Sequence, residues 1–204
     1  MTPQNEQTPT VFIVDDDAAI RFAMQALMDS VNLNHEIFAS ADEFLEKMTD
    51  QRPGCLVLDI RMPGLGGLEL QEELIKRGNT LPIIFITGHG DVPMAVDAMQ
   101  KGAVDFIQKP FRDQELLDRI REALATDEER REQQQHHAEV ASRLNRLTNR
   151  EREVFDLVVT GKPNKVIAYE LGVSQRTVEI HRARVMEKMQ ARSLADLVRM
   201  HMTA

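Results

Sequence analysis

The chain has very little of the sulfur chemistry that holds small secreted domains or metal-thiolate sites together. Cys55 is the one cysteine in 204 residues, so an intramolecular disulfide and a site with several thiolate ligands are both excluded. Because Cys55 precedes the apolar run 56–58, we interpret it as a small buried residue rather than a reactive thiol.

Long apolar runs are also missing. No stretch approaches the roughly 20 apolar residues that a helix needs to cross a bilayer. The first ten residues, MTPQNEQTPT, lack the basic and apolar regions of a signal peptide. We therefore expect a cytoplasmic protein that does not bind membranes.

The formal net charge of −8 is distributed unevenly along the chain. Residues 1–125 carry 11 basic and 21 acidic side chains, whereas residues 148–204 carry 10 basic and 7 acidic ones. This asymmetry indicates an acidic module joined to a mildly basic one. A nucleic acid, if one is bound, is expected at the C-terminal part.

Five short apolar runs alternate with amphipathic stretches in the first part of the chain. Runs that are apolar on both faces suit a parallel sheet covered by helices on both sides. The alternation predicts an α/β doubly wound domain with five parallel strands. The runs lie at 10–14, 35–38, 55–58, 82–86 and 104–107, and helical spacing follows at 18–31, 41–48, 66–76, 92–101 and from Asp113 onward.

The remaining sequence shows only helical patterns. Residues 126–147 are polar and contain neither Gly nor Pro, which favours a helical linker. The pair His136 and His137 has no third ligand nearby, so we interpret it as part of that solvated linker rather than as a metal site. Residues 148–204 fit an all-α domain with helices near 149–160, 163–171, 174–189 and 193–202.

Polar residues follow the predicted strands where each strand ends. Asp15, Asp16 and Asp17 follow the first strand, Asp59 the third, Thr87 the fourth, and Lys109 comes after the fifth. In a doubly wound sheet, ligands bind beyond the carboxyl ends of the strands, where the strand order reverses. We therefore expect the carboxylates of Asp15, Asp16 and Asp59 to converge.

Converging carboxylates repel one another unless a cation compensates them. Oxygen ligands with room for water suit Mg²⁺, and a carboxylate beside a metal, a hydroxyl and an ammonium can accept a phosphoryl group as an acyl phosphate. Two alternatives stay open from the residues alone. Each aspartate could be a solvated turn residue, and the same set could serve a phosphohydrolase with an aspartate nucleophile.

Four motifs in this part of the chain resemble the receiver domain of two-component response regulators. They are IVDDD at 13–17, LDIRMPG at 58–64, ITGHGDVPMAV at 86–96 and DFIQKPF at 105–111. The resemblance implies that the strands lie in the order 2-1-3-4-5, that Asp59 is the phosphoacceptor, that Thr87 and Lys109 assist it, and that Thr87 and Phe106 form the switch. It also implies a site for Mg²⁺ (or Mn²⁺) made by Asp15, Asp16, Asp59 and the backbone carbonyl of Arg61, and a cis bond between Lys109 and Pro110.

The basic segment has the pattern of a helix–turn–helix. Val166, Ile167, Ala168 and Leu171 are the apolar positions of a first helix, and Gly172 makes the turn. The following helix pairs a buried apolar stripe with a basic face and could enter the major groove. A small helical bundle that contacts protein is the alternative from the pattern alone.

LTNRE, KVIAYELGVS and RTVEIHRARVMEKM resemble the LuxR/FixJ class of DNA-binding domains. That resemblance implies base-facing positions at Glu179, Ile180 and Ala183. The candidates for phosphate contacts are Arg176, Thr177, His181, Arg182, Arg184 and Lys188, although His181 could instead be buried against the bundle.

Together the two resemblances indicate a FixJ-type response regulator with a receiver at 1–125, a helical linker at 126–147 and a LuxR-type domain at 148–204. The resemblance implies a non-enzymatic regulator that a sensor histidine kinase phosphorylates. It also implies that the phosphorylated protein forms a homodimer on double-stranded promoter DNA at the nucleoid, with RNA polymerase as a further partner and an activator role. A phosphohydrolase and a protein-binding adaptor remain the rival functions.

Overall fold

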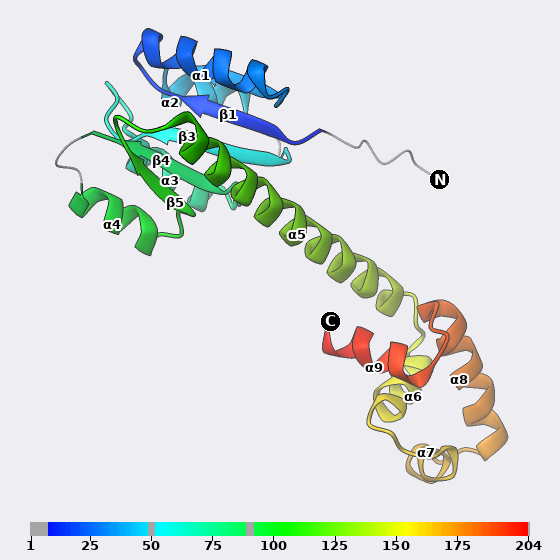
Figure 1. Cartoon of the computed structure of the whole chain (residues 1–204). Coiled ribbons are helices and arrows are strands. Elements are labelled where there is room, and N and C mark those ends of the chain that lie inside the picture. The colour runs from blue at the N-terminus through cyan, green and yellow to red at the C-terminus, as the bar shows by residue number, and fades with distance from the viewer. Residues whose placement is uncertain (1–7, 49–51, 89–91, 204) are drawn as a thin grey trace. The chain divides into compact units, whose positions relative to one another are not determined.

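The computed structural model describes residues 8–48, 52–88 and 92–203 (Figure 1). The chain divides into two compact units, one ending at Arg130 and one beginning at Arg131. Within the described ranges, no helix is both long and apolar enough to span a membrane. The two units are described separately below.

The first unit is built on a parallel sheet of five strands. These are β1 (Thr10–Val14), β2 (His35–Phe38), β3 (Gly54–Asp59), β4 (Ile83–Thr87) and β5 (Asp105–Gln108). Their order is β2-β1-β3-β4-β5, and every neighbouring pair is parallel. The predicted fold class and strand order are confirmed, and the order reverses between β1 and β3.

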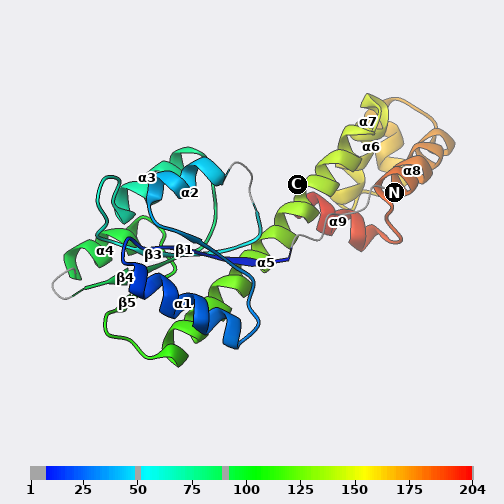
Figure 2. The same ribbon diagram turned by 90° about the horizontal axis from the view of Figure 1, so that it is seen from above.

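Helices cover both faces of the sheet, as Figure 2 shows. Helices α2 (Ala41–Lys47), α3 (Gly67–Lys76) and α4 (Val92–Gln100) pack on one face, where Phe12, Phe44 and Phe85 are fully buried. Helices α1 (Ala18–Ser30) and α5 (Asp113–Asn145) pack on the other. Burial on both faces explains why the strands are continuously apolar rather than alternating.

The connection after β3 needs a glycine. A Cβ atom added at Gly67 would lie 2.2 Å from the main-chain oxygen of Asp59, which is an impossible contact. Gly67 therefore lets α3 begin directly against the end of β3. The helix start is fixed further by Glu69, whose carboxylate accepts a 2.6 Å hydrogen bond from the Gly66 N–H.

The middle of α5 contacts the start of β3 and the segment that precedes β4. This helix runs through most of the predicted linker. Asp127 is 2% exposed, and its Oδ2 accepts a 2.9 Å hydrogen bond from the N–H of Gly54 at the start of β3. Arg130 pairs with Asp127 and donates to the carbonyl of Thr80. Cys55 is buried, so the prediction of a small buried cysteine is confirmed, and burial, with a smaller effect of Asp127, raises the pKa of its thiol to about 12.

The second unit contains α6 (Asn149–Val159), α7 (Asn164–Leu171), α8 (Gln175–Met189) and α9 (Leu194–Met202). Gly172 ends α7 at φ 65°, in the left-handed region where glycine is favoured, and Ser174 caps α8. Ile167, Ala168, Val178 and Val185 are buried in its core, with Val140 and Leu144 from the last turns of α5. Val166 differs from the expected apolar position, because its side chain is 40% exposed.

Candidate functional site

Three carboxylates meet at the edge of the sheet where the strand order reverses. Asp15 and Asp16 follow β1, and Asp59 is the last residue of β3. Each offers an oxygen atom that lies within 4.8 Å of the others. Asp15 is buried, Asp59 is nearly so, and Asp16 is exposed, so the cluster opens to solvent on the side of Asp16.

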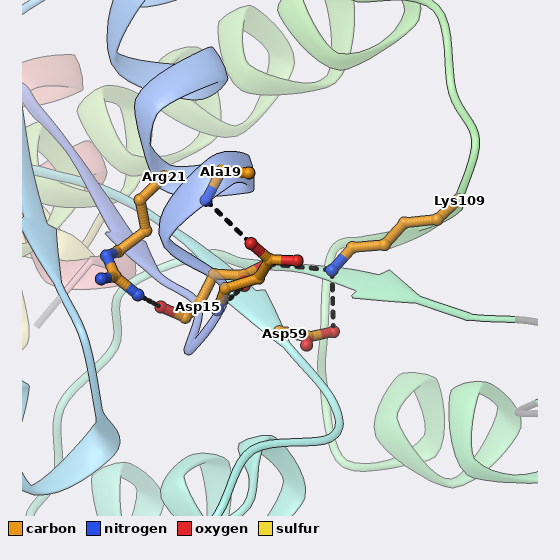
Figure 3. Close-up of polar contacts among 6 residues, drawn as sticks. Asp15, Ala19, Arg21, Asp59 and Lys109 are labelled. Carbon is orange, nitrogen blue, oxygen red and sulfur yellow. Dashed lines mark hydrogen bonds and ion pairs between the residues drawn. The ribbon is translucent and has the colours of Figure 1, made fainter.

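Lys109 joins the cluster from the loop after β5. Its ammonium nitrogen lies 2.9 Å from Oδ2 of Asp15 and 3.4 Å from Oδ1 of Asp59 (Figure 3). The peptide bond between Lys109 and Pro110 is cis, as the sequence motif implied. The main-chain N–H of Lys109 donates a 2.8 Å hydrogen bond to the carbonyl of Thr87, which joins the ends of β4 and β5 beside the carboxylates.

Burial and the neighbouring carboxylates make the ionised form of Asp59 less favourable than it is in water. Burial raises the pKa of Asp59 above its ordinary value, Lys109 opposes this shift, and the charge of Asp15 adds to it. Burial alone would lower the pKa of Lys109, but the hydrogen bond to Asp15 and the charges of Asp15 and Asp59 raise it. Lys109 is therefore a permanent cation at this edge.

One ammonium cannot neutralise three carboxylates. When all three are ionised, Asp15, Asp16, Asp59 and Lys109 together carry a net charge of −2, which matches the charge of one divalent cation. All the donors are oxygen atoms, and the exposed side at Asp16 leaves room for water ligands. Both features fit Mg²⁺ or Mn²⁺ better than a transition metal that prefers nitrogen or sulfur.

The other residues predicted for this site lie around the cluster. Thr87 is the last residue of β4 and is buried, and its hydroxyl donates to the carbonyl of Gly88 at 3.2 Å. Phe106 pairs with Phe85 in the β4–β5 register and is 39% exposed. Arg61 is exposed, two residues beyond Asp59. Residues 89–91 of the third motif lie outside the described residues.

The turn between β1 and α1 contains an interaction that sequence reasoning missed. Nη1 of Arg21 donates a 2.7 Å hydrogen bond to the main-chain carbonyl of Asp15. Asp17 caps α1 by accepting from the N–H of Ala19, and its own N–H donates to Oδ1 of Asp15. The only sequence signal for the first contact is an arginine on α1 six residues after Asp15.

The second candidate site is α8, the helix that follows the turn after α7. One side of α8 is exposed, and Ile180 on this side is 48% exposed. Of the predicted DNA-contacting residues, Arg176, Glu179, Ile180, Ala183 and Arg184 are exposed, whereas Thr177, His181, Arg182 and Lys188 are partly buried. The predicted residues therefore divide into an outer set and an inner set on the same helix.

The inner set makes contacts within the domain. Arg182 donates a 3.0 Å hydrogen bond to Oδ1 of Asn164 at the start of α7. Lys188 forms an ion pair with the buried carboxylate of Glu151 on α6. Nδ1 of His181 is buried and has no hydrogen-bond partner among the described residues. Side chains in this set hold α8 on the helical core, whatever else they bind.

Both parts of the chain match known protein families. Residues 11–121 match the response regulator receiver domain, and residues 145–201 match the bacterial regulatory proteins of the luxR family. The chain is 51% identical to nodulation protein W of Bradyrhizobium diazoefficiens over 95% of its own length and 85% of that protein. It is 46% identical to the transcriptional regulatory protein FixJ of Azorhizobium caulinodans, over 95% of this chain and 92% of the relative.

Solved structures give the same result. The response regulator StyR superposes with a TM-score of 0.89 at 44% identity, covering 97% of this chain and 100% of that structure. Full-length FixJ from B. japonicum superposes with a TM-score of 0.61 at 42% identity, covering 96% of each chain. The similarity thus extends through both units and the helix between them.

Proposed function

The chain belongs to the FixJ-type two-component response regulators, and on that premise we propose that phosphorylation of Asp59 by a sensor histidine kinase promotes dimerisation and sequence-specific promoter binding. The protein is a transcription regulator with a receiver and a LuxR-type DNA-binding domain, rather than an enzyme. We assign the receiver to residues 1–125, the linker to 126–147 and the DNA-binding domain to 148–204.

The proposal rests on the meeting of Asp15, Asp16, Asp59 and Lys109 at one edge of the sheet. A carboxylate oxygen of Asp59 attacks the phosphorus of the kinase's phosphohistidine. The new P–O bond forms as the P–N bond breaks, and the imidazole leaves with a proton from solvent. Lys109 neutralises the phosphoryl oxygens as charge shifts between donor and acceptor.

Mg²⁺ (or Mn²⁺) is the proposed cofactor of this transfer. Asp15, Asp16 and Asp59 would hold it through carboxylate oxygens, with the backbone carbonyl of Arg61 as a further ligand. The ion, when bound, screens the negative charges of nucleophile and phosphoryl group from each other. The ammonium group of Lys109 already pairs with the Asp15 carboxylate at 2.9 Å, so Lys109 also compensates the charge of Asp15 in the absence of phosphate.

The signal is proposed to leave the site through Thr87 and Phe106. Phosphorylated Asp59 offers an acceptor to the Thr87 hydroxyl, which donates to the Gly88 carbonyl in this structure. The hydrogen bond between Lys109 and Thr87 joins β4 to β5, the strand that carries Phe106. Movement of these groups would alter the face formed by α4, β5 and α5, which we propose as the dimerisation surface.

DNA binding is assigned to α8, whose N-terminal half would enter the major groove. Glu179, Ile180 and Ala183 are the proposed base-facing residues, and a glutamate there can accept from the amino group of cytosine. The exposed residues Arg176 and Arg184, with Thr177, His181, Arg182 and Lys188, are the proposed phosphate contacts. Two copies would bind two half-sites of a promoter in the cytoplasm and contact RNA polymerase to activate transcription.

The switch can be tested with the full-length protein and beryllofluoride, which mimics the phosphoryl group on an aspartate. Sedimentation gives the oligomeric state, and fluorescence anisotropy gives the affinity for promoter fragments selected from the genome. We expect beryllofluoride to promote dimers and tighter DNA binding in the wild type and in Asp42→Asn, an exposed aspartate on α2. If Asp59→Asn responds to beryllofluoride as the wild type does, the switch model is wrong.

A further inference from the structure

The peptide group between Asp15 and Asp16 is held by a side chain from α1. Nη1 of Arg21 donates to the carbonyl oxygen of this peptide at 2.7 Å. Figure 3 shows Arg21 and Lys109 reaching Asp15 from opposite sides, one toward its main chain and the other toward its carboxylate. Because a peptide group is planar, fixing its oxygen also fixes the direction in which the chain leaves toward the Cα of Asp16.

The rest of this turn is fixed by separate contacts. The N–H of Asp15 donates to the carbonyl of Phe38 on β2, and Oδ1 of Asp15 accepts from the N–H of Asp17. Asp17 in turn caps α1 through the N–H of Ala19. Asp16 lies between these anchored residues and is the exposed member of the carboxylate cluster. The orientation of its side chain therefore depends on the peptide that Arg21 holds.

We propose that Arg21 is a positioning residue for the divalent cation, because it directs the Asp16 carboxylate toward Asp59 and so sets the affinity of the pocket for Mg²⁺. This inference rests on the proposed metal-binding function of the cluster. Residues that orient metal ligands typically change metal affinity 10–100-fold when they are removed. A loss of about that size is expected when Arg21 is replaced by alanine.

The direction of the effect separates this role from a simple effect of charge. Arg21 carries a positive charge next to a site for a dication, and like charges repel. If Arg21 acted through its charge alone, its removal would strengthen Mg²⁺ binding. If it acts by holding the peptide, its removal weakens Mg²⁺ binding, although an unfavourable charge has been taken away.

The test is calorimetric titration of Mg²⁺ into the full-length protein without a phosphate donor. The variants are Arg21→Ala, Arg21→Lys, Asp16→Asn and the control Arg77→Ala, which removes an arginine that pairs with Glu73 on the surface of α3. We expect affinity to fall about 10–100-fold in Arg21→Ala, to be lost in Asp16→Asn, and to be unchanged in Arg77→Ala. Arg21→Lys keeps the charge and a donor and should lie between Arg21→Ala and the wild type.

Urea unfolding of the same variants shows which of them are folded. If Arg21→Ala does not fold, the test uses Arg21→Lys instead. Weaker Mg²⁺ binding by folded Arg21→Lys than by the wild type then supports the positioning role. Equal or tighter Mg²⁺ binding by a folded Arg21 variant, with a wild type that binds one ion, overturns the positioning role and leaves the proposed function standing. A wild type that binds no divalent cation overturns the metal site and the role of Arg21 together.

Discussion

The ammonium nitrogen of Lys109 lies 3.4 Å from Oδ1 of Asp59, although β4 lies between β3, which ends at Asp59, and β5, which precedes Lys109. The side chain of Lys109 extends across the end of β4, because the main-chain N–H of Lys109 is hydrogen-bonded to the carbonyl of Thr87. A cation therefore lies next to the proposed nucleophile, although β3 and β5 are not neighbours in the sheet.

Replacement of Lys109 by alanine should slow phosphorylation of Asp59. The variant loses the cation that compensates the phosphoryl oxygens, and losses of one such group typically cost about 100-fold in rate. The rate can be followed by intact mass spectrometry with acetyl phosphate as donor. Lys47→Ala, which removes a surface lysine paired with Glu43 on α2, should react at the wild-type rate. A wild-type rate in Lys109→Ala would exclude this role.

The ion pair between Glu151 and Lys188 predicts a pH dependence of stability in the DNA-binding domain. The hydrogen bond from Lys188, with that from the Thr148 N–H, lowers the pKa of Glu151 to about 2. A depressed carboxylate pKa stabilises the fold above the unfolded pKa of about 4.5, and this contribution is lost as pH falls toward 2. Because Lys188 is 34% exposed, the contribution is about 1–3 kcal/mol rather than more.

Urea unfolding of the wild type and Glu151→Gln between pH 2 and 7 measures this contribution as a difference. The two proteins should differ most near neutral pH and converge at the acid end. Glu153→Gln, which changes an exposed neighbour paired with Arg150, is the matched control and should follow the wild type throughout. A constant difference across the pH range would contradict the assignment to Glu151.

Arg184 and Lys188 should respond differently when DNA binding is measured against salt. Arg184 is exposed on α8, so its loss should remove a phosphate contact and reduce the slope of log K against log salt by about 1. Lys188 is a proposed phosphate contact that is also paired with Glu151, so Lys188→Met should lower the free energy of unfolding and change the slope less than Arg184→Ala does. Anisotropy titrations at several salt concentrations check both. The division into outer and inner residues fails if Lys188→Met changes the slope more than Arg184→Ala does.

The sequence is informative where side-chain type and strand position together determine geometry. Asp15, Asp16 and Asp59 could be predicted to meet because parallel strands end at one edge, and an apolar run marks each strand. Gly172 and Ser174 could be placed because a helix end and a helix start favour those residue types.

Other contacts leave no such pattern. Arg21 binds a main-chain carbonyl, which every residue possesses, so nothing in the sequence marks its partner. Val166 occurs within an apolar stretch but lies on the outer side of α7, because a short helix can bury only one face. Asp127 looks like a solvated linker residue because it lies in a polar run, and only the tertiary fold brings it to the N–H of Gly54.

Asp127 should therefore contribute to the stability of the receiver rather than to solubility of the linker. Asp127→Ala leaves the Gly54 N–H buried without this acceptor and removes the carboxylate that pairs with Arg130. Loss of a hydrogen bond to a charged group, with a buried donor left behind, costs about 2–4 kcal/mol. Asp118→Ala, on an exposed face of the same helix, should cost less than about 0.5 kcal/mol. Urea unfolding of both variants gives the comparison. Equal stabilities would mean that the first turns of the linker do not stabilise the receiver and are not part of its folding unit.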